Sequence, residues 1–287
     1  MERPGWFDES LFPFESKFME IDGSTVHYVD VGTGPAIVMV HGNPAWSFLY
    51  RKVIAGLQDR FRCIAVDNPG FGLSKGAPGY GFTPHEHSAV LGKLVDSLGL
   101  DEFTVMANDW GGPIGFGMAV ERSERVRSLI VCNTWAWPMT GNKQAERFSK
   151  VLNSSLGGLA ITRLNFFHIV MRTSFKRSKL SKAEWAMYKG PFPTADSRKP
   201  IAVLPGAILG ETPWLQEISD KLSKLADKPA LILWPDKDPA FRSPQRKKWQ
   251  NLLPNNHTVI IEGAGHFVQD DAGEELVAEI GEWWPGA

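Results

Sequence analysis

The chain of 287 residues is long for a small domain and suits one large domain that carries an insertion. Apolar residues make up 43% of it and charged residues 22%, which predicts a sizeable core and argues against a disordered protein. The formal net charge is −1 and no basic block is present, so neither nucleic acid nor an anionic membrane is an expected partner. No apolar run reaches the roughly 18 residues that span a bilayer, and the first ten residues lack the apolar core of a secretory signal.

The first predicted elements are two short alternating strands, Lys17–Asp22 and Thr25–Asp30, joined by an Asp-Gly turn. Four compact apolar runs follow, and helix-length amphipathic segments such as Glu86–Leu98 separate them. These runs are Ala36–Val40, Arg62–Val66, Phe103–Ala107 and Ser128–Cys132. The alternation is typical of an α/β fold with a doubly wound, mostly parallel sheet.

The two cysteines, Cys63 and Cys132, both lie in these apolar runs. An unpaired cysteine behaves as a small hydrophobic residue, so we expect two buried free thiols rather than a disulfide. Free thiols persist in a reducing compartment, and we therefore predict that the protein is cytoplasmic.

The alternation of strands and helices stops near Pro138. Helical segments without buried strands occupy the chain from there to about Trp214, and Ser181 to Glu184 form a capping box that predicts the start of one helix. Strands resume with Ala230–Trp234 and Thr258–Ile261. We therefore predict a main domain of residues 1–137 and 215–287, interrupted by a helical cap over 138–214.

Polar side chains follow four of the predicted strands at the point where each strand ends. The segments are His41-Gly42-Asn43-Pro44, Asn108-Asp109-Trp110-Gly111-Gly112, Pro235-Asp236-Lys237-Asp238 and Glu262-Gly263-Ala264-Gly265-His266. Ligands of an open parallel sheet bind beyond the carboxyl ends of its strands. We therefore expect carboxylates, an amide, an indole and an imidazole to meet at one edge of the sheet.

Asp109 stands where a nucleophile elbow would place its nucleophile. Ala107 and Gly111 are the small residues that such a tight strand-to-helix turn needs on both sides. The helix that begins near Gly111 would turn its free N–H groups toward the carboxylate. The simpler interpretation, an Asp that only caps a helix, does not explain both small residues. A nucleophilic carboxylate can displace a leaving group at an sp³ carbon and form an alkyl ester.

Hydrolysis of that ester requires a base to activate water, and His266 is the candidate. Among seven histidines, it alone follows the last predicted strand in a Gly-Ala-Gly-His turn. The rival His41 is better interpreted as a residue that shapes its loop. A base histidine also needs an orienting acid. Asp236 and Asp238 both follow the preceding strand, and their spacing leaves both open.

Four segments together resemble the haloalkane dehalogenases of the α/β-hydrolase superfamily, over nearly the whole chain from Lys17 to Trp284. They are His41-Gly42-Asn43-Pro44, Asp67-Asn68-Pro69-Gly70-Phe71-Gly72, Asp109-Trp110-Gly111-Gly112 and Gly263-Ala264-Gly265-His266. The resemblance implies the α/β-hydrolase fold with a helical cap. It also implies hydrolysis of a small halogenated organic substrate by water to an alcohol, a halide ion and a proton, without a metal or organic cofactor. The oligomeric state stays open.

The resemblance implies roles for individual residues as well. Asn43 and Trp110 match the family's donors to the departing halide, and preorganised donors at a developing anion lower the barrier. Asp238 matches the acid of those branches that use an aspartate, in preference to Asp236. The branch that uses a glutamate places it after the strand that ends near Cys132, where this chain has Asn133 and no carboxylate.

The walls of the substrate pocket would come mainly from the cap. The candidates are Trp137, Phe148, Phe192, Pro205 and Phe267, and the alternative for each is ordinary packing. A second hypothesis is epoxide hydrolysis by the same Asp109, His266 and Asp238. That reaction usually needs cap tyrosines, and Tyr188 is the only tyrosine of the insert. A catalytically silent binding protein is the third alternative.

Overall fold

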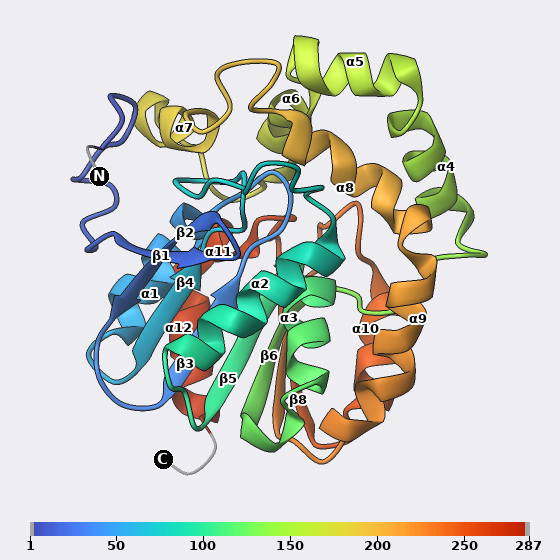
Figure 1. Ribbon diagram of the computed structural model, residues 1–287. Coiled ribbons are helices and arrows are strands. Elements are labelled where there is room, and N and C mark those ends of the chain that lie inside the picture. The colour runs from blue at the N-terminus through green and yellow to red at the C-terminus, as the bar shows by residue number, and fades with distance from the viewer. Residues whose placement is uncertain (1–2, 285–287) are drawn as a thin grey trace.

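Eight strands form one sheet within residues 3–284, the part of the chain that the computed structural model describes (Figure 1). Their spatial order is β1-β2-β4-β3-β5-β6-β7-β8. β2 runs antiparallel to β1 and β4, and the other neighbouring pairs are parallel. The strands are Lys17–Ile21, Ser24–Val31, Ala36–Val40, Arg62–Val66, Phe103–Asp109, Val126–Thr134, Ala230–Pro235 and Asn256–Ile261, from β1 to β8. The predicted α/β fold with a mostly parallel sheet is confirmed.

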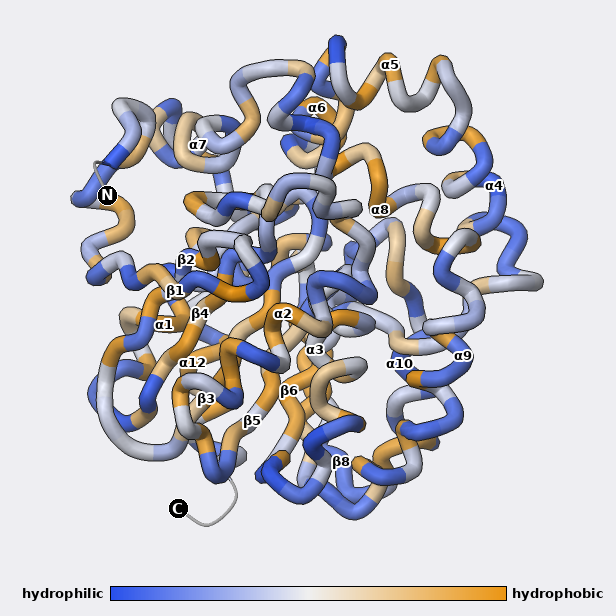
Figure 2. The backbone as a smooth tube through the Cα atoms, viewed as in Figure 1, coloured by the Kyte–Doolittle hydropathy of each residue, from blue (hydrophilic) through white to orange (hydrophobic). Residues whose placement is uncertain are grey.

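The central strands are buried on both faces of the sheet, as their continuous apolar runs predict. Every residue of β3 and of β7 is buried. Successive side chains point to opposite faces, so Val38 and Val40 belong to one hydrophobic core while Ile37 and Met39 belong to the other. Figure 2 shows these apolar strands inside a largely polar periphery.

Helices cover both faces of the sheet. α1 (Arg51–Leu57) packs against α12 (Gly273–Trp283) on one face, and α2 (Pro84–Ser97) packs against α3 (Gly111–Val120) on the other. α2 begins with a capping box at Thr83, close to the start predicted for this helix. The other elements of the main domain are η1 (Ser47–Tyr50), η2 (Ser123–Arg125), α10 (Ser243–Leu252) and α11 (Val268–Asp271).

The segment between β6 and β7 is helical, as predicted. It contains α4 (Lys143–Leu152), α5 (Ser155–Leu164), α6 (Phe166–Ser174), α7 (Lys182–Lys189), α8 (Lys199–Gly210), α9 (Thr212–Lys221) and η3 (Leu222–Leu225). Figure 1 shows α4 to α8 over the carboxyl edge of the sheet, and α7 opens with the predicted capping box. The predicted boundary at residue 214 falls inside α9, which contacts α3 of the main domain. Among the helices of residues 3–284, none is long and apolar enough to cross a membrane.

The register of the parallel strands brings the loops with the predicted site residues to one edge of the sheet. Val40 of β3 is paired with Ala107 of β5, and Pro235 of β7 is paired with Ile261 of β8. β7 and β8 end at the same level of the sheet, and β5 runs two residues beyond the end of β3, to Asp109. The loops that follow β3, β5, β7 and β8 therefore leave the sheet directly beneath the cap.

Candidate active site

Asp109 lies at the turn between β5 and α3 with a left-handed backbone, φ 49°. Such a conformation is costly for a residue with a side chain and is typical of functional turns. The turn also requires small neighbours. A Cβ on Gly111 would overlap the carbonyl oxygen of Val40, and one on Gly112 would overlap the hydroxyl of Thr134. The backbone therefore has the geometry of a nucleophile elbow.

The carboxylate of Asp109 is held by backbone N–H groups and faces an imidazole. The N–H of Asn43 donates to Oδ1 at 2.8 Å, and the N–H of Trp110 is a further backbone donor. Oδ2 lies 3.7 Å from Nε2 of His266. Burial raises the pKa of Asp109, although the charge of His266 and the two N–H groups act against this rise. A carboxylate stripped of water in this way is a stronger nucleophile than one in bulk solvent.

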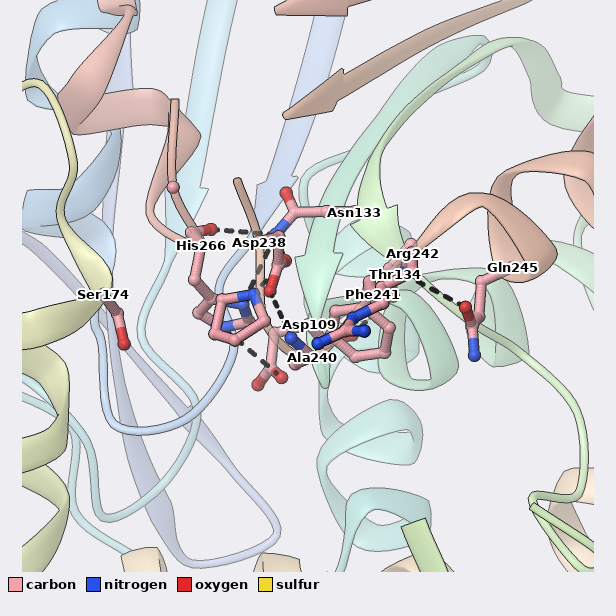
Figure 3. Close-up of polar contacts among 12 residues, drawn as sticks. Asp109, Asn133, Thr134, Ser174, Asp238, Ala240, Phe241, Arg242, Gln245 and His266 are labelled. Carbon is pink, nitrogen blue, oxygen red and sulfur yellow. Dashed lines mark hydrogen bonds and ion pairs between the residues drawn. The ribbon is translucent and has the colours of Figure 1, made fainter. Parts of the chain in front are cut away.

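Of the two candidate acids, Asp238 is the one beside His266 (Figure 3). Nδ1 of His266 lies 3.0 Å from Oδ2 of Asp238, whose Oδ1 accepts from the N–H of Ala240 at 2.7 Å. Asp236 is exposed and instead binds Lys237 and the N–H of Gly263. The carboxylate of Asp238 holds His266 in one orientation, as a base histidine requires.

The pKa of His266 reflects competing influences. Burial lowers it, but the charge and hydrogen bond of Asp238 and the charge of Asp109 raise it further, to about 9. The pKa of Asp238 falls below its usual value, because the favourable contacts with His266 and the N–H of Ala240 outweigh its burial. Asp109, His266 and Asp238 thus form one electrostatic unit at the edge of the sheet.

His41, the rival base, has its hydrogen-bond partners outside this unit. Its Nδ1 donates to the carbonyl of Gly42 at 2.9 Å, and its Nε2 accepts from the N–H of Asn68 at 3.0 Å. Burial lowers the pKa of His41. Both ring nitrogens are used to join two loops, which agrees with the predicted loop-shaping role.

Asn133 is a site residue whose contacts were not predicted from the sequence, where it was noted only as a position without a carboxylate. From the end of β6, its Nδ2 donates to Oδ2 of Asp238 at 2.6 Å and to the carbonyl of His266 at 2.8 Å (Figure 3). It is fully buried. Asn133 follows a predicted strand, which indicated that it lies at the functional edge of the sheet. Its contacts could not be predicted, because both partners lie more than 100 residues away in the sequence.

Asn43 and Trp110, the predicted halide donors, both line a cavity of about 520 Å³ beneath the cap. Nδ2 of Asn43 donates one hydrogen to the carbonyl of Ile201 in α8 at 3.1 Å, and a primary amide carries a second hydrogen. In the described part of the chain, the indole N–H of Trp110 has no hydrogen-bond acceptor. Asp109 and His266 line the same cavity.

The predicted pocket residues divide into two groups. Phe148, Pro205 and Phe267 line the cavity. Trp137 and Phe192 do not: Trp137 packs against Trp249 with ring centroids 5.1 Å apart, and Phe192 packs edge-on against Phe71. Both aromatic rings fill the core that joins cap and main domain, which was the alternative interpretation. The cavity also has lining residues that the prediction omitted, among them Trp135 and Phe241, whose rings stack 5.3 Å apart.

Tyr188, the cap tyrosine of the epoxide hypothesis, is buried outside this cavity. Its hydroxyl donates to Oδ2 of Asp270 at 2.5 Å. It therefore cannot protonate a substrate oxygen above Asp109 without leaving its present site. Within residues 3–284, no group of three or more His, Cys, Asp or Glu side chains is arranged to hold a metal ion.

The fold and the arrangement at its edge define an α/β-hydrolase, and a family model described as alpha/beta hydrolase fold matches residues 35–273. Haloalkane dehalogenase 2 of Mycobacterium tuberculosis (strain ATCC 25618 / H37Rv) is 41% identical over 275 residues, which cover 95% of this chain and 96% of that protein. This chain therefore belongs to the haloalkane dehalogenase family of the α/β-hydrolase superfamily.

Other relatives have different names or share only the fold. The cis-3-alkyl-4-alkyloxetan-2-one decarboxylase of Shewanella oneidensis is 32% identical over 95% of this chain and 89% of its own. The crystal structure of haloalkane dehalogenase DbeA from Bradyrhizobium elkani USDA94 superimposes with a TM-score of 0.86 at 24% identity, covering 94% of this chain and 97% of that one. This structural similarity concerns the fold alone.

Proposed function

We propose that this protein hydrolyses haloalkanes to an alcohol and a halide ion through a covalent ester on Asp109. The observation that carries the proposal is the position of the Asp109 carboxylate. It borders the cavity, is held by the N–H of Asn43 at 2.8 Å, and lies 3.7 Å from Nε2 of His266. Membership of the haloalkane dehalogenase family supports the same reaction.

In the first step, an oxygen of Asp109 attacks the carbon that bears the halogen. A carbon–oxygen bond forms, the carbon–halogen bond breaks, and the halide leaves with the electron pair. The side-chain N–H groups of Asn43 and Trp110 would hold the departing anion in the cavity. Each such donor contributes ~2.7–4 kcal/mol to transition-state stabilisation in comparable oxyanion sites.

In the second step, His266 takes a proton from a water molecule as the water oxygen adds to the carbonyl carbon of the ester. The tetrahedral intermediate then collapses: the bond between this carbon and the alkoxy oxygen breaks, the alkoxide takes the proton from His266 and leaves as the alcohol, and Asp109 regains its carboxylate by releasing a proton. Asp238, 3.0 Å from Nδ1, stabilises the imidazolium that forms. The backbone N–H groups of Asn43 and Trp110 already bind the carboxylate of Asp109. They are placed to hold the oxyanion of the tetrahedral intermediate.

Esterification of Asp109 also prepares His266 for this second step. The ester is neutral, so the charge of Asp109 no longer raises the pKa of His266. The pKa of His266 in the alkyl-enzyme is therefore lower than about 9, its value beside the free carboxylate. The imidazole becomes available as a base once the ester that it must help to hydrolyse has formed.

Halide release from a panel of bromoalkanes of increasing length tests the proposal. We expect turnover by the native enzyme and none by Asp109→Asn, a matched variant without a nucleophilic carboxylate. Styrene oxide and a cis-3,4-dialkyl oxetan-2-one serve as competing substrates in parallel. Faster consumption of either one than of every bromoalkane would overturn the proposal.

We also propose that the enzyme works in the cytoplasm. Cys63 and Cys132 are buried free thiols, as predicted. Burial raises the pKa of the Cys63 thiol to about 12, which keeps it protonated. Such thiols persist in a reducing compartment. Fractionation of the source cells tests this location. Recovery of the protein outside the cytoplasmic fraction would contradict it.

A further inference from the structure

The wall of the catalytic cavity contains an arginine that the reaction does not use. Among the described residues, the ionisable side chains that line this cavity are Asp109, His266 and Arg242. The first two perform the proposed chemistry. Arg242 lies between the loop after β7 and the start of α10, and in Figure 3 its side chain extends from α10 toward the side where Asp109 and His266 lie.

No carboxylate of residues 3–284 is paired with Arg242. Its backbone N–H donates to Oε1 of Gln245 at 3.2 Å, while its side chain is exposed and forms no ion pair within the described chain. Some other arginines near the surface are paired, as Arg122 is with Asp96 and Arg177 with Glu275. The guanidinium of Arg242 is thus a free cation at the mouth of a cavity.

The residues around Arg242 make one side of this mouth polar. Asn142, Gln144 and Gln245 line the cavity together with Arg242. Gln144 donates from Nε2 to the carbonyl of Pro239 at 3.3 Å, which joins α4 of the cap to the loop that carries Arg242. Most of the other lining residues are apolar, among them Phe148, Phe166, Phe167, Val170 and Ile208.

A ligand that fits this arrangement has an apolar body and an anionic end. Near the arginine, Phe241 lies over the ring of His266 with centroids 5.9 Å apart, so its chain neighbour Arg242 stands just outside the reacting centre. A guanidinium presents a planar fork of N–H donors that matches a carboxylate in two parallel hydrogen bonds. A halogen placed at Asp109 and a carboxylate placed at Arg242 require an alkyl chain between them.

We infer that Arg242 is a specificity-determining residue that binds a carboxylate at the far end of the substrate, so that the substrate class includes ω-halocarboxylates. This inference rests on the proposed dehalogenation and adds to it the identity of the distal group. The alkyl chain of such a substrate lies along the apolar wall formed by α4, α6 and α8.

The test compares halide release from 6-bromohexanoate and from 1-bromohexane, expressed as the ratio of the two kcat/KM values. We expect Arg242→Gln to lower this ratio by about tenfold, a moderate effect for a charged hydrogen bond near solvent. Arg242→Lys keeps the charge without the fork and should give an intermediate ratio. The control Lys247→Gln removes the same charge from an exposed residue of α10 outside the cavity and should keep the native ratio.

An unchanged ratio in Arg242→Gln would overturn the inference while leaving the proposed dehalogenation intact. If neither bromide releases halide, the proposed reaction fails, and the carboxylate site is then tested by calorimetric binding of hexanoate. Weaker binding to Arg242→Gln than to Lys247→Gln supports the site, whereas equal binding overturns it.

Discussion

His266 must be neutral to act as a base, although its surroundings favour the charged form. Asp238 and Asp109 together raise its pKa to about 9 despite its burial. Only the contact with Asp238 survives when Asp109 becomes an ester. In the proposed mechanism, the two halves of the reaction therefore differ at this residue: the attack by Asp109 would not use His266 as a base, and hydrolysis of the ester would.

Replacement of His266 by glutamine should separate the two halves. We expect His266→Gln to release about one equivalent of halide per enzyme and then stop, because the ester forms but no base activates water. Mass spectrometry of the intact protein should show the added alkyl group. Continued steady turnover by this variant would contradict the role of His266 as the base.

The pH dependence of the two steps should differ in the same way, with only ester hydrolysis requiring neutral His266. Only neutral His266 accepts a proton from water, so the steady-state rate should fall as the pH drops through the pKa of His266 in the alkyl-enzyme. That pKa lies below about 9, because the charge of Asp109 is lost in the ester. The initial burst of halide should persist over the same range. A steady-state rate that rises on acidification would contradict this order of events.

The indole N–H of Trp110 should be needed chiefly for halide departure. Trp110→Phe removes one donor from the cavity wall, and we expect the burst of halide to slow by about 10²–10³-fold. The matched control is Trp137→Phe, at a tryptophan that does not line the cavity. Rapid-quench measurement of halide distinguishes the two variants. Equal rates in both would contradict the halide-binding role.

At the scale of elements, the loop that carries His266 is fastened to the cap by one buried carboxylate. Asp271 of α11 accepts from the N–H groups of Gly265 at 2.7 Å and Lys176 at 2.8 Å through Oδ2, and from Ser178 at 2.8 Å through Oδ1. The N–H of His266 itself donates to the carbonyl of Ser174 at 3.0 Å. The end of α6 and the turn before His266 therefore hold each other in place.

Loss of Asp271 should affect ester hydrolysis more than halide release. Asp271→Ala leaves three N–H groups without their acceptor, at about 1–3 kcal/mol of stability for each one that water cannot reach. We expect the steady-state rate to fall further than the burst rate, because the position of His266 matters only in the second step. The control Glu275→Ala, which removes an exposed partner of Arg177, should change both rates little. Equal slowing of both steps in the Asp271 variant would contradict a positioning role.

The strands were largely predictable because buried parallel strands have an evident apolar pattern. The ends of β5 and β6 were predicted too short. In the structure Asp109 is paired with Thr134, two positions beyond the predicted end of each strand. Polar residues such as Asn108 and Asn133 end the apolar pattern, but pairing with a neighbouring strand continues through them. That pairing is a property of the sheet and is not visible in either segment alone.

At the scale of the molecule, a buried network of charges joins the cap to the main domain. Arg51 donates to both oxygens of Asp270, at 2.8 and 2.9 Å, and reaches Glu184 of α7 at 2.7 Å. Tyr188 of the same cap helix donates to Asp270 as well. Burial lowers the pKa of Arg51, but the charge of Asp270 and the hydrogen bonds to Asp270 and Glu184 keep this pKa above its already high usual value, so the charge of Arg51 is permanent.

Removal of this arginine should destabilise the whole fold. Arg51→Met leaves the buried Asp270 without its main partner, and breaking a buried pair from one side costs about 3–5 kcal/mol. Urea unfolding measures the change in the free energy of unfolding. The control Lys93→Met removes an exposed partner of Asp22 and should cost about 1 kcal/mol or less. A loss in Arg51→Met no larger than in this control would contradict the role of the network.

The sequence by itself determined the α/β class, the strands, the helical insert and the family. It also predicted that Asp109 and His266 share one edge, because the carboxyl ends of parallel strands always meet there. Their catalytic roles, together with those of Asp238, Asn43 and Trp110, stay predictions that the geometry supports.

Only the tertiary structure decided which polar groups at that edge touch. It placed Asp238 rather than Asp236 against His266, joined Asn133 to both, and turned Trp137 and Phe192 into the core. A strand pattern specifies where a loop leaves the sheet, whereas the direction of each side chain depends on partners that are distant in the sequence. The position of Asp109 at the carboxyl edge of the sheet follows from its strand. The contacts of the residues around it follow from the packed fold.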